Sequence, residues 1–184
     1  PGFMTTDVSS VRLRRSLNAA GYRAYGWELG RNLGARANLL DRLASRIAAV
    51  HASHGQPVAL IGWSLGGVFA REVAKQVPQQ VSLVMTLGSP FSGDMRANNA
   101  WRFYEAINDH PVDRPPLELE LSVKPPVPTI AVWSRTDGII SAPSARGLPD
   151  ESDRQVEVAC RHLNYARSPV GITAIGQLLA DYLG

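Results

Sequence analysis

The sequence predicts an α/β fold, with a doubly wound, mostly parallel sheet of about five strands and helices on both faces. Two observations predict this class. Short, almost wholly apolar runs alternate along the chain with longer segments in which apolar residues recur at helical spacing. The apolar runs also lack polar alternation, as expected for strands that helices cover on both faces. Strands joined through helices in this way form right-handed crossovers and therefore a parallel sheet.

Helical patterning is clearest in residues 38–54. Leu40, Leu43 and Ile47 recur on one face of this segment, and Gly55 follows it as a typical C-terminal residue. The expected helices are 8–20, 38–54, 68–77 and a last helix that begins at Pro169 with Ser168 as its N-cap.

Strands are expected at the short apolar runs between these helices. Turn residues bound them: Gly88, Ser89 and Pro90, for example, end the run 81–87. The expected strands are 22–27, 58–61, 81–87, 129–133 and 156–159.

Residues 93–128 interrupt the alternation of strands and helices. This segment contains Trp101 and then a charged, proline-rich tract. Its length and its position between two strands are typical of a small cap over the sheet edge. A surface helix plus linker that never contacts substrate is the alternative. No internal repeat is visible, so we expect residues 1–184 to form a single domain.

Composition narrows the class of protein further. The 184 residues are 45% hydrophobic with a mean hydropathy of -0.10, which is enough apolar material for a sizeable core. No window approaches the roughly 20 apolar residues of a membrane span. The net charge is +3, but the basic residues are scattered, and Arg12, Arg14 and Arg15 form the densest run. The sequence shows no basic patch interleaved with aromatic residues, so we expect no nucleic-acid partner. It also shows no zinc-ligand spacing, so we expect no metal site.

Cysteine usage bears on the compartment. Cys160 is the only cysteine, so no intrachain disulfide can form. This usage fits a reducing compartment, and we expect a cytoplasmic protein. The chain begins with Pro1 and not with Met, so a leader peptide that has been lost stays an open alternative.

The most informative motif is Gly-Trp-Ser-Leu-Gly at residues 62–66, between the expected strand 58–61 and the expected helix 68–77. A G-x-S-x-G pentapeptide at such a junction is typical of the nucleophile elbow of serine hydrolases. The strained turn lifts the Ser64 hydroxyl above the sheet edge. It also leaves the Leu65 N–H, at a helix N-terminus, free to donate to a developing oxyanion.

A serine nucleophile needs a histidine base and an acid that orients it. In a parallel sheet these residues must follow the carboxyl ends of strands. His162 is the only histidine directly after an expected strand, and Asp137 follows the strand 129–133. A surface loop histidine and a plain Asp-Gly turn are the alternatives at these positions. Three acids in a later polar loop are the other candidates for the acid: Asp150, Glu151 and Asp153. The chain order Ser64, Asp137, His162 is that of α/β-hydrolases, and differs from the trypsin-like and subtilisin-like orders.

These residues resemble the α/β-hydrolase superfamily, close to bacterial serine esterases and lipases, over nearly the whole chain. Residues 62–67 resemble the elbow of that family and residues 134–138 its acid loop. His162 matches its late histidine, although Cys-Arg precedes it where Gly-Ser or Gly is commoner. Pro-Gly-Phe at residues 1–3 resembles the end of its oxyanion loop, which implies that the Phe3 N–H is the second oxyanion donor.

The resemblance also implies a strand that this chain lacks. In the family, the strand entering the oxyanion loop lies between the strands that correspond to 22–27 and 58–61. Three alternatives follow: the native protein is longer, the sheet closes so that 22–27 pairs with 58–61, or another chain supplies the strand and makes an oligomer.

We therefore expect an enzyme that cleaves carboxylic esters of short or medium acyl chains through an acyl-enzyme, without a cofactor. The expected partner is a small-molecule ester. The alternatives are a non-catalytic binding module with the hydrolase fold, and an acyltransferase or thioesterase. The residues that flank the catalytic loops are candidates for a substrate pocket, with core or cap packing as their alternative: Trp63, Phe91, Trp101 and Ile139.

Overall fold

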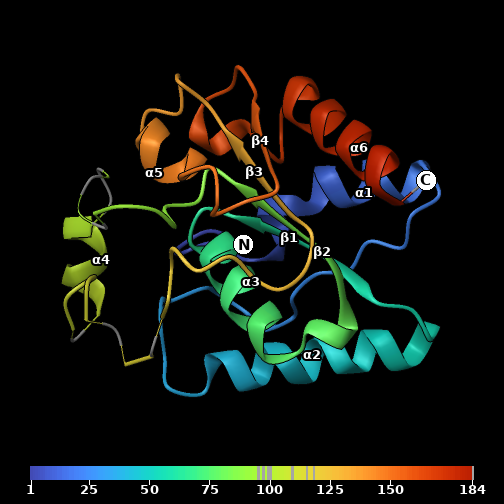
Figure 1. Ribbon diagram of the computed structural model, residues 1–184, viewed down its shortest axis with the longest axis horizontal. Coiled ribbons are helices and arrows are strands. Elements are labelled where there is room, and N and C mark those ends of the chain that lie inside the picture. Colours follow the sequence, from blue (N-terminus) through green and yellow to red (C-terminus); the bar gives the residue numbers. More distant parts are fainter. Residues whose placement is uncertain are drawn as a thin grey trace.

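Four parallel strands form the central sheet of the computed structural model (Figure 1). The structure describes residues 1–94, 96, 98, 101–108, 110–114, 116–117 and 119–183. Within these residues the strands lie in their chain order, β1-β2-β3-β4, and every neighbouring pair is parallel. Their bounds are β1 Val58–Trp63, β2 Val81–Leu87, β3 Thr129–Trp133 and β4 Arg154–Glu157.

Helices cover both faces of this sheet. Helices α2 and α3 lie on one side, and α1 and α6 lie on the other (Figure 1). This arrangement confirms the α/β class and the doubly wound parallel sheet. The helices are α1 Val11–Ala19, α2 Leu39–His54, α3 Leu65–Gln76, α4 Trp101–Ile107, α5 Ala142–Arg146 and α6 Pro169–Leu183, with short 3₁₀ turns at Asp7–Ser10, Pro78–Gln80 and His162–Asn164. No helix among the described residues is long and apolar enough to cross a bilayer.

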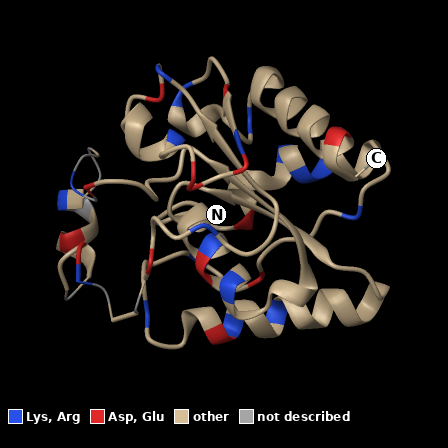
Figure 2. Ribbon diagram, in the orientation of Figure 1, with Lys and Arg blue, Asp and Glu red and all other residues tan. Residues whose placement is uncertain are grey.

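Successive residues of β2 supply the cores on the two faces, because side chains alternate along a strand. Leu83 and Met85, both fully buried, pack with α1 and α6. Val84, equally buried, packs with Ile47 of α2 and Val73 of α3 on the other face. Figure 2 shows that charged residues lie mainly on the helices and loops, while β1, β2 and β3 carry none. The apolar strands therefore have two apolar surroundings, as their sequence predicts.

The strand predicted at residues 22–27 does not form, so the sheet has four strands where about five were expected. Backbone amides of this segment bond elsewhere: Ala24 N–H donates to Asn18 Oδ1 (2.8 Å) and Trp27 N–H donates to Asp7 Oδ1 (2.9 Å). The physical reason is that a strand needs a neighbour, and no described segment pairs with residues 22–27. The alternative in which this segment closes onto the strand 58–61 is therefore wrong for this structure.

Boundaries at both ends of the chain also differ from the predictions. The strand expected at 156–159 lies at Arg154–Glu157, and its side chains are exposed or half-buried. The helix expected over 8–20 is divided into a 3₁₀ turn and α1. Helical spacing from Ile175 and Leu179 predicts that Tyr182 lies on the buried face of the last helix, but Tyr182 is 38% exposed. Residues near the ends of elements have fewer tertiary neighbours, so local pattern locates them less well.

The cap segment, residues 93–128, is partly described. It contains the short helix α4, and the Tyr104 hydroxyl in this helix accepts a hydrogen bond from Ala35 N–H (3.1 Å). The later part of the segment is held by Arg71 of α3, whose Nη2 donates to the carbonyls of Leu121 (3.3 Å) and Val123 (3.4 Å). The segment is thus attached to the loop before α2 and to α3.

Arg71 is fully buried in spite of its charge. Its Nη1 donates to the Glu151 carbonyl (3.0 Å), and its guanidinium lies 4.1 Å from the centre of the Phe91 ring. Burial lowers the pKa of Arg71 to about 10, and the charges of Glu151 and Glu72 oppose this shift. One side chain therefore ties α3, the cap segment and the loop after α5 together.

We predict that Arg71→Met lowers the free energy of unfolding by about 3 kcal/mol or more, because it removes the donor to the buried Glu151 carbonyl and to two partly buried carbonyls, those of Leu121 and Val123. Urea unfolding measures the change. The control is Arg42→Met on the exposed face of α2, which should change stability by less than about 0.5 kcal/mol. Equal effects of the two substitutions would contradict the anchoring role of Arg71.

Candidate active site

Ser64 occupies the turn between β1 and α3 in a strained backbone conformation, with φ 54° and ψ -126°. Positive φ is unfavourable for a residue with a side chain, and it is found where the surrounding structure enforces it. Two glycines allow the sharp turn. A Cβ on Gly62 would lie 2.4 Å from Gly67 Cα, and a Cβ on Gly67 would lie 2.0 Å from Ser89 Oγ. The sequence Gly62 to Gly67 therefore forms the elbow geometry that its motif predicts.

Asp137 and His162 meet at the carboxyl ends of β3 and β4. His162 Nδ1 lies 2.9 Å from Asp137 Oδ2, and His162 N–H donates to the Asp137 carbonyl (2.8 Å). The other carboxylate oxygen, Oδ1, accepts from the N–H groups of Ile139 (3.0 Å) and Ile140 (2.7 Å). Both side chains are almost fully buried, at 3% and 4% exposure. Three donors thus fix the carboxylate, and the carboxylate fixes the imidazole.

Trp63 connects this pair to the elbow. Its indole Nε1–H donates to the His162 carbonyl (3.0 Å), and the two rings lie with centroids 5.6 Å apart. Trp63 directly precedes Ser64, so the same contact brings the imidazole beside the elbow. Because Nδ1 faces Asp137, Nε2 is the nitrogen that remains for the Ser64 hydroxyl. Ser64 and His162 lie within the described residues, and no hydrogen bond joins their side chains in this structure.

The buried Asp137 charge affects its neighbours. Burial first, and then the charge of Asp137, raises the pKa of the Cys160 thiol to about 11, so this thiol stays protonated at neutral pH. The same two causes raise the pKa of the Tyr165 hydroxyl. The Tyr165 ring is fully buried and meets the His162 ring edge-on, at 6.3 Å and 89°. These groups stay neutral, so the acid faces no competing charge on this side.

The N-terminal residues pack against the elbow. A Cβ on Gly66 would lie 2.5 Å from the Pro1 carbonyl oxygen, and one on Gly2 would lie 3.3 Å from Ser64 Cβ. Asn32, 1% exposed, holds this loop: its Nδ2 donates to the Pro1 carbonyl (2.8 Å) and its own carbonyl accepts from Met4 N–H (2.7 Å). Local sequence pattern does not predict this role of Asn32, which is marked only by its place in a glycine-flanked loop.

The two predicted oxyanion donors come from these neighbouring segments. Leu65 is the first residue of α3, directly after Ser64. Phe3 lies in the loop that Asn32 holds, and its ring packs in a tilted orientation against Tyr104 of the cap segment, with the ring centres 5.1 Å apart. The structure therefore brings both residues to the elbow.

The four candidate pocket residues have different surroundings. Phe91 is fully buried under the Arg71 guanidinium, and Trp63 is 8% exposed against His162. These two therefore have the packing role that the sequence left as the alternative. Ile139 packs with Trp133 and Ile140. Trp101 lies on α4, and two guanidinium groups lie near the centre of its ring, that of Arg96 at 5.4 Å and that of Arg102 at 5.2 Å. Their roles toward a substrate stay predictions.

No group of three or more His, Cys, Asp and Glu side chains in the described part of the chain could hold a metal ion.

An elbow after the first strand, with an acid and a histidine after the third and fourth strands, defines the α/β-hydrolase fold. Solved structures with this fold are similar over nearly the whole chain. A monoacylglycerol lipase of Paleococcus ferrophilus has a TM-score of 0.68 at 14% identity, covering 98% of this chain and 92% of its own. A lipase-esterase related protein of Clostridium acetobutylicum has a TM-score of 0.69 at 14% identity, and the match covers 98% of this chain and 91% of that one. A pyrethroid hydrolase of Sphingobium faniae has a TM-score of 0.65 at 15% identity, and the match covers 98% of this chain and 94% of that one.

The family model of the PGAP1-like alpha/beta domain matches residues 24–141, which is more than half of the chain. The chain therefore belongs to the PGAP1-like α/β domain family, within the α/β-hydrolase class that the sequence resembles. No curated protein matches the chain significantly.

We predict that Gly67→Ala destabilises the protein by about 2 kcal/mol or more, since its Cβ would overlap the Ser89 side chain and the Gly62 carbonyl. The matched control is Gly176→Ala in α6, where a Cβ meets nothing within 4 Å. Alanine there should stabilise the helix slightly. Thermal unfolding followed by circular dichroism compares the two. A Gly67→Ala protein as stable as the control would contradict the close packing of the elbow.

Proposed function

We propose that the protein is a serine hydrolase that cleaves carboxylic esters of short or medium acyl chains. The observation that carries this proposal is the buried Asp137–His162 pair, held by Trp63 beside a strained serine at a strand-to-helix turn. An imidazole locked by a carboxylate is the base that a serine hydroxyl needs in order to become nucleophilic.

The mechanism follows from these positions. Ser64 Oγ attacks the ester carbonyl while His162 Nε2 takes its proton, and Asp137 stabilises the resulting imidazolium. The N–H groups of Leu65 and Phe3 donate to the oxyanion of the tetrahedral intermediate. His162 then protonates the leaving alcohol. A water molecule, deprotonated by the same histidine, attacks the acyl-enzyme and releases the acid. Ser64 Oγ and His162 Nε2 must come within hydrogen-bond distance when substrate binds, because catalytic hydrogen bonds that are long in a free enzyme often tighten in its complex with substrate.

The named functions of the similar structures support the proposal by analogy. Two of them are described as a lipase and a lipase-esterase related protein, and the third as a hydrolase. Shared fold alone does not fix chemistry, so the weight rests on the site. We choose short or medium acyl chains because no extended segment for lipid binding is evident in the sequence.

One observation favours a second candidate, a binding module with the hydrolase fold that lacks turnover. Ser64 and His162 share no hydrogen bond in the described structure. If the two side chains never approach, the Asp137–His162 pair stabilises the loop and catalyses nothing. The experiments below separate the two candidates.

Ser64→Ala should lower hydrolysis of p-nitrophenyl butyrate by about a thousandfold or more, because it removes the nucleophile. The control, Ser45→Ala on the exposed face of α2, should leave the rate unchanged. A fluorophosphonate should add its mass to Ser64 in the unmodified protein. Turnover that survives Ser64→Ala, or an adduct on another residue, would contradict the assignment, and absence of turnover and adduct would favour the binding module.

Asp137→Asn should lower kcat on the same ester by about ten-thousandfold, since an amide favours the wrong imidazole tautomer while the fold stays intact. The control is Asp150→Asn, which removes the same charge from an exposed loop and should change kcat little. Similar rates for the two variants would mean that Asp137 is not the acid of the site.

A further inference from the structure

Tyr165 is a fully buried tyrosine close to the acid of the candidate site, and the proposed mechanism does not use it. It lies shortly after His162 in the chain, and its ring meets the imidazole edge-on, with the ring centres 6.3 Å apart. Its hydroxyl oxygen is buried and has no partner at ordinary hydrogen-bond distance among the described residues. A buried hydroxyl without a partner is unfavourable, so an acceptor is expected close to it.

The Asp137 carboxylate has an acceptor position that no described donor fills. A carboxylate accepts about four hydrogen bonds, two on each oxygen. Oδ1 accepts from the N–H groups of Ile139 and Ile140, and Oδ2 faces His162 Nδ1. Within the part of the chain that the structure describes, no other donor reaches Oδ2. One acceptor position on this oxygen is therefore open, although the carboxylate is almost fully buried.

Gly88, directly after β2, lets the Tyr165 ring and this oxygen approach each other. A Cβ on Gly88 would lie 2.8 Å from Asp137 Oδ2 and 2.6 Å from Tyr165 Cε2. It would lie 3.2 Å from Tyr165 Cζ, the carbon that carries the hydroxyl. The same small space therefore borders the hydroxyl-bearing edge of the ring and the oxygen with the open position. A side chain at residue 88 would fill that space.

The surroundings of Tyr165 keep it in place as a donor. A Cβ on Gly171 of α6 would lie 2.2 Å from the Tyr165 carbonyl oxygen, so this helix is in close contact with the Tyr165 backbone. The ring belongs to the core between the sheet, α1 and α6. Burial first, and then the charge of Asp137, raises the pKa of the Tyr165 hydroxyl. The hydroxyl therefore keeps its proton at neutral pH and can donate it to an acceptor.

We propose that Tyr165 is a positioning residue, whose hydroxyl donates to Asp137 Oδ2 and so holds the carboxylate that orients His162. The bond forms when the Tyr165 side chain turns toward Oδ2. A second donor on this oxygen fixes its position and favours the charged carboxylate, so the proton taken from Ser64 stays on the imidazole. This proposal rests on the proposed function, because positioning matters to the rate only if His162 is the base.

The kinetic test is a double-mutant cycle between Tyr165 and Asp137. Tyr165→Phe, which keeps the ring, should lower kcat on p-nitrophenyl butyrate about tenfold and leave KM within about twofold. In an Asp137→Asn background the same substitution should change kcat less than about twofold, because the amide nitrogen in place of Oδ2 cannot accept from the hydroxyl. Equal losses of kcat in the two backgrounds would overturn the proposal, since the hydroxyl would then act independently of the acid.

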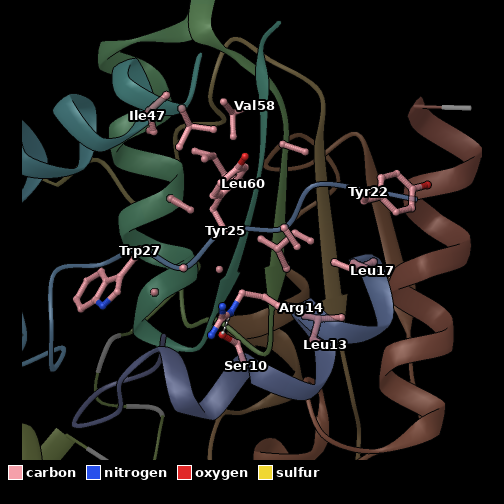
Figure 3. Close-up of a pocket in the computed structure, with 18 of the residues that line it drawn as sticks. Ser10, Leu13, Arg14, Leu17, Tyr22, Tyr25, Trp27, Ile47, Val58 and Leu60 are labelled. Atoms are coloured by element: carbon pink, nitrogen blue, oxygen red, sulfur yellow. Dashed lines mark hydrogen bonds between the residues drawn. The ribbon is translucent and has the colours of Figure 1, made fainter. Parts of the chain in front are cut away.

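The matched control is Tyr22→Phe, which also removes one tyrosine hydroxyl. Tyr22 is half-buried against the same core. It lines a cavity of about 660 Å³ beside β1, and neither Asp137 nor His162 borders that cavity (Figure 3). Tyr22→Phe should therefore leave kcat unchanged. A loss of kcat in Tyr22→Phe as large as that in Tyr165→Phe would contradict a specific role of Tyr165.

Proton NMR of the protein without substrate tests the hydrogen bond independently of turnover. The His162 Nδ1–H resonance should move downfield in Tyr165→Phe, because a carboxylate that loses one donor accepts more strongly from the other. Replacement of Tyr165 by meta-fluorotyrosine, which keeps the ring and donates more strongly, should move the resonance upfield. Tyr22→Phe should leave it in place. A resonance that moves in neither variant of Tyr165 would overturn the proposal.

The two measurements distinguish failure of this proposal from failure of the proposed function. An unmodified protein that neither hydrolyses the ester nor takes up the fluorophosphonate at Ser64 would contradict the proposed function. The resonance would still show whether Tyr165 donates to Asp137. Turnover at Ser64 together with a resonance that does not respond would contradict the role of Tyr165 alone.

Discussion

The candidate site depends on the contact between the Asp137 carboxylate and the His162 imidazole, 2.9 Å apart and almost fully buried. A carboxylate in that position is unfavourable unless donors surround it. Ile139 N–H, Ile140 N–H and the imidazole supply them. This requirement holds the loops after β3 and β4 together, and it orients one imidazole nitrogen away from the acid.

The second constraint is the backbone of the elbow. Ser64 has a positive φ, and the chain turns so sharply that Gly62 and Gly67 come into backbone contact. Packing of α3 between the sheet and α2 offsets the strain, and Trp63 uses the same turn to reach His162. Stability and the proposed chemistry therefore share residues. A change in the elbow would affect both the fold and the position of the imidazole.

Local pattern in the sequence predicts much of this arrangement. The apolar runs 81–87 and 129–133 form β2 and β3 at the expected residues, and the structure brings Asp137 and His162 together. Residues 22–27 have equally good strand patterning and form no strand, because a strand depends on a neighbour that local sequence does not reveal. The role of Trp63 was missed for a related reason: its hydrogen-bond partner lies 99 residues away. Asn32 likewise acts through contacts 31 residues distant.

The proposed catalysis requires that Asp137 orients His162 Nε2 toward the Ser64 hydroxyl. A crystal structure of the protein after reaction with a fluorophosphonate tests this requirement. We expect phosphorus on Ser64 Oγ, with His162 Nε2 within about 3 Å of that oxygen and a phosphonyl oxygen facing the N–H groups of Leu65 and Phe3. An imidazole that stays bound to Asp137 but points away from the modified serine would contradict it.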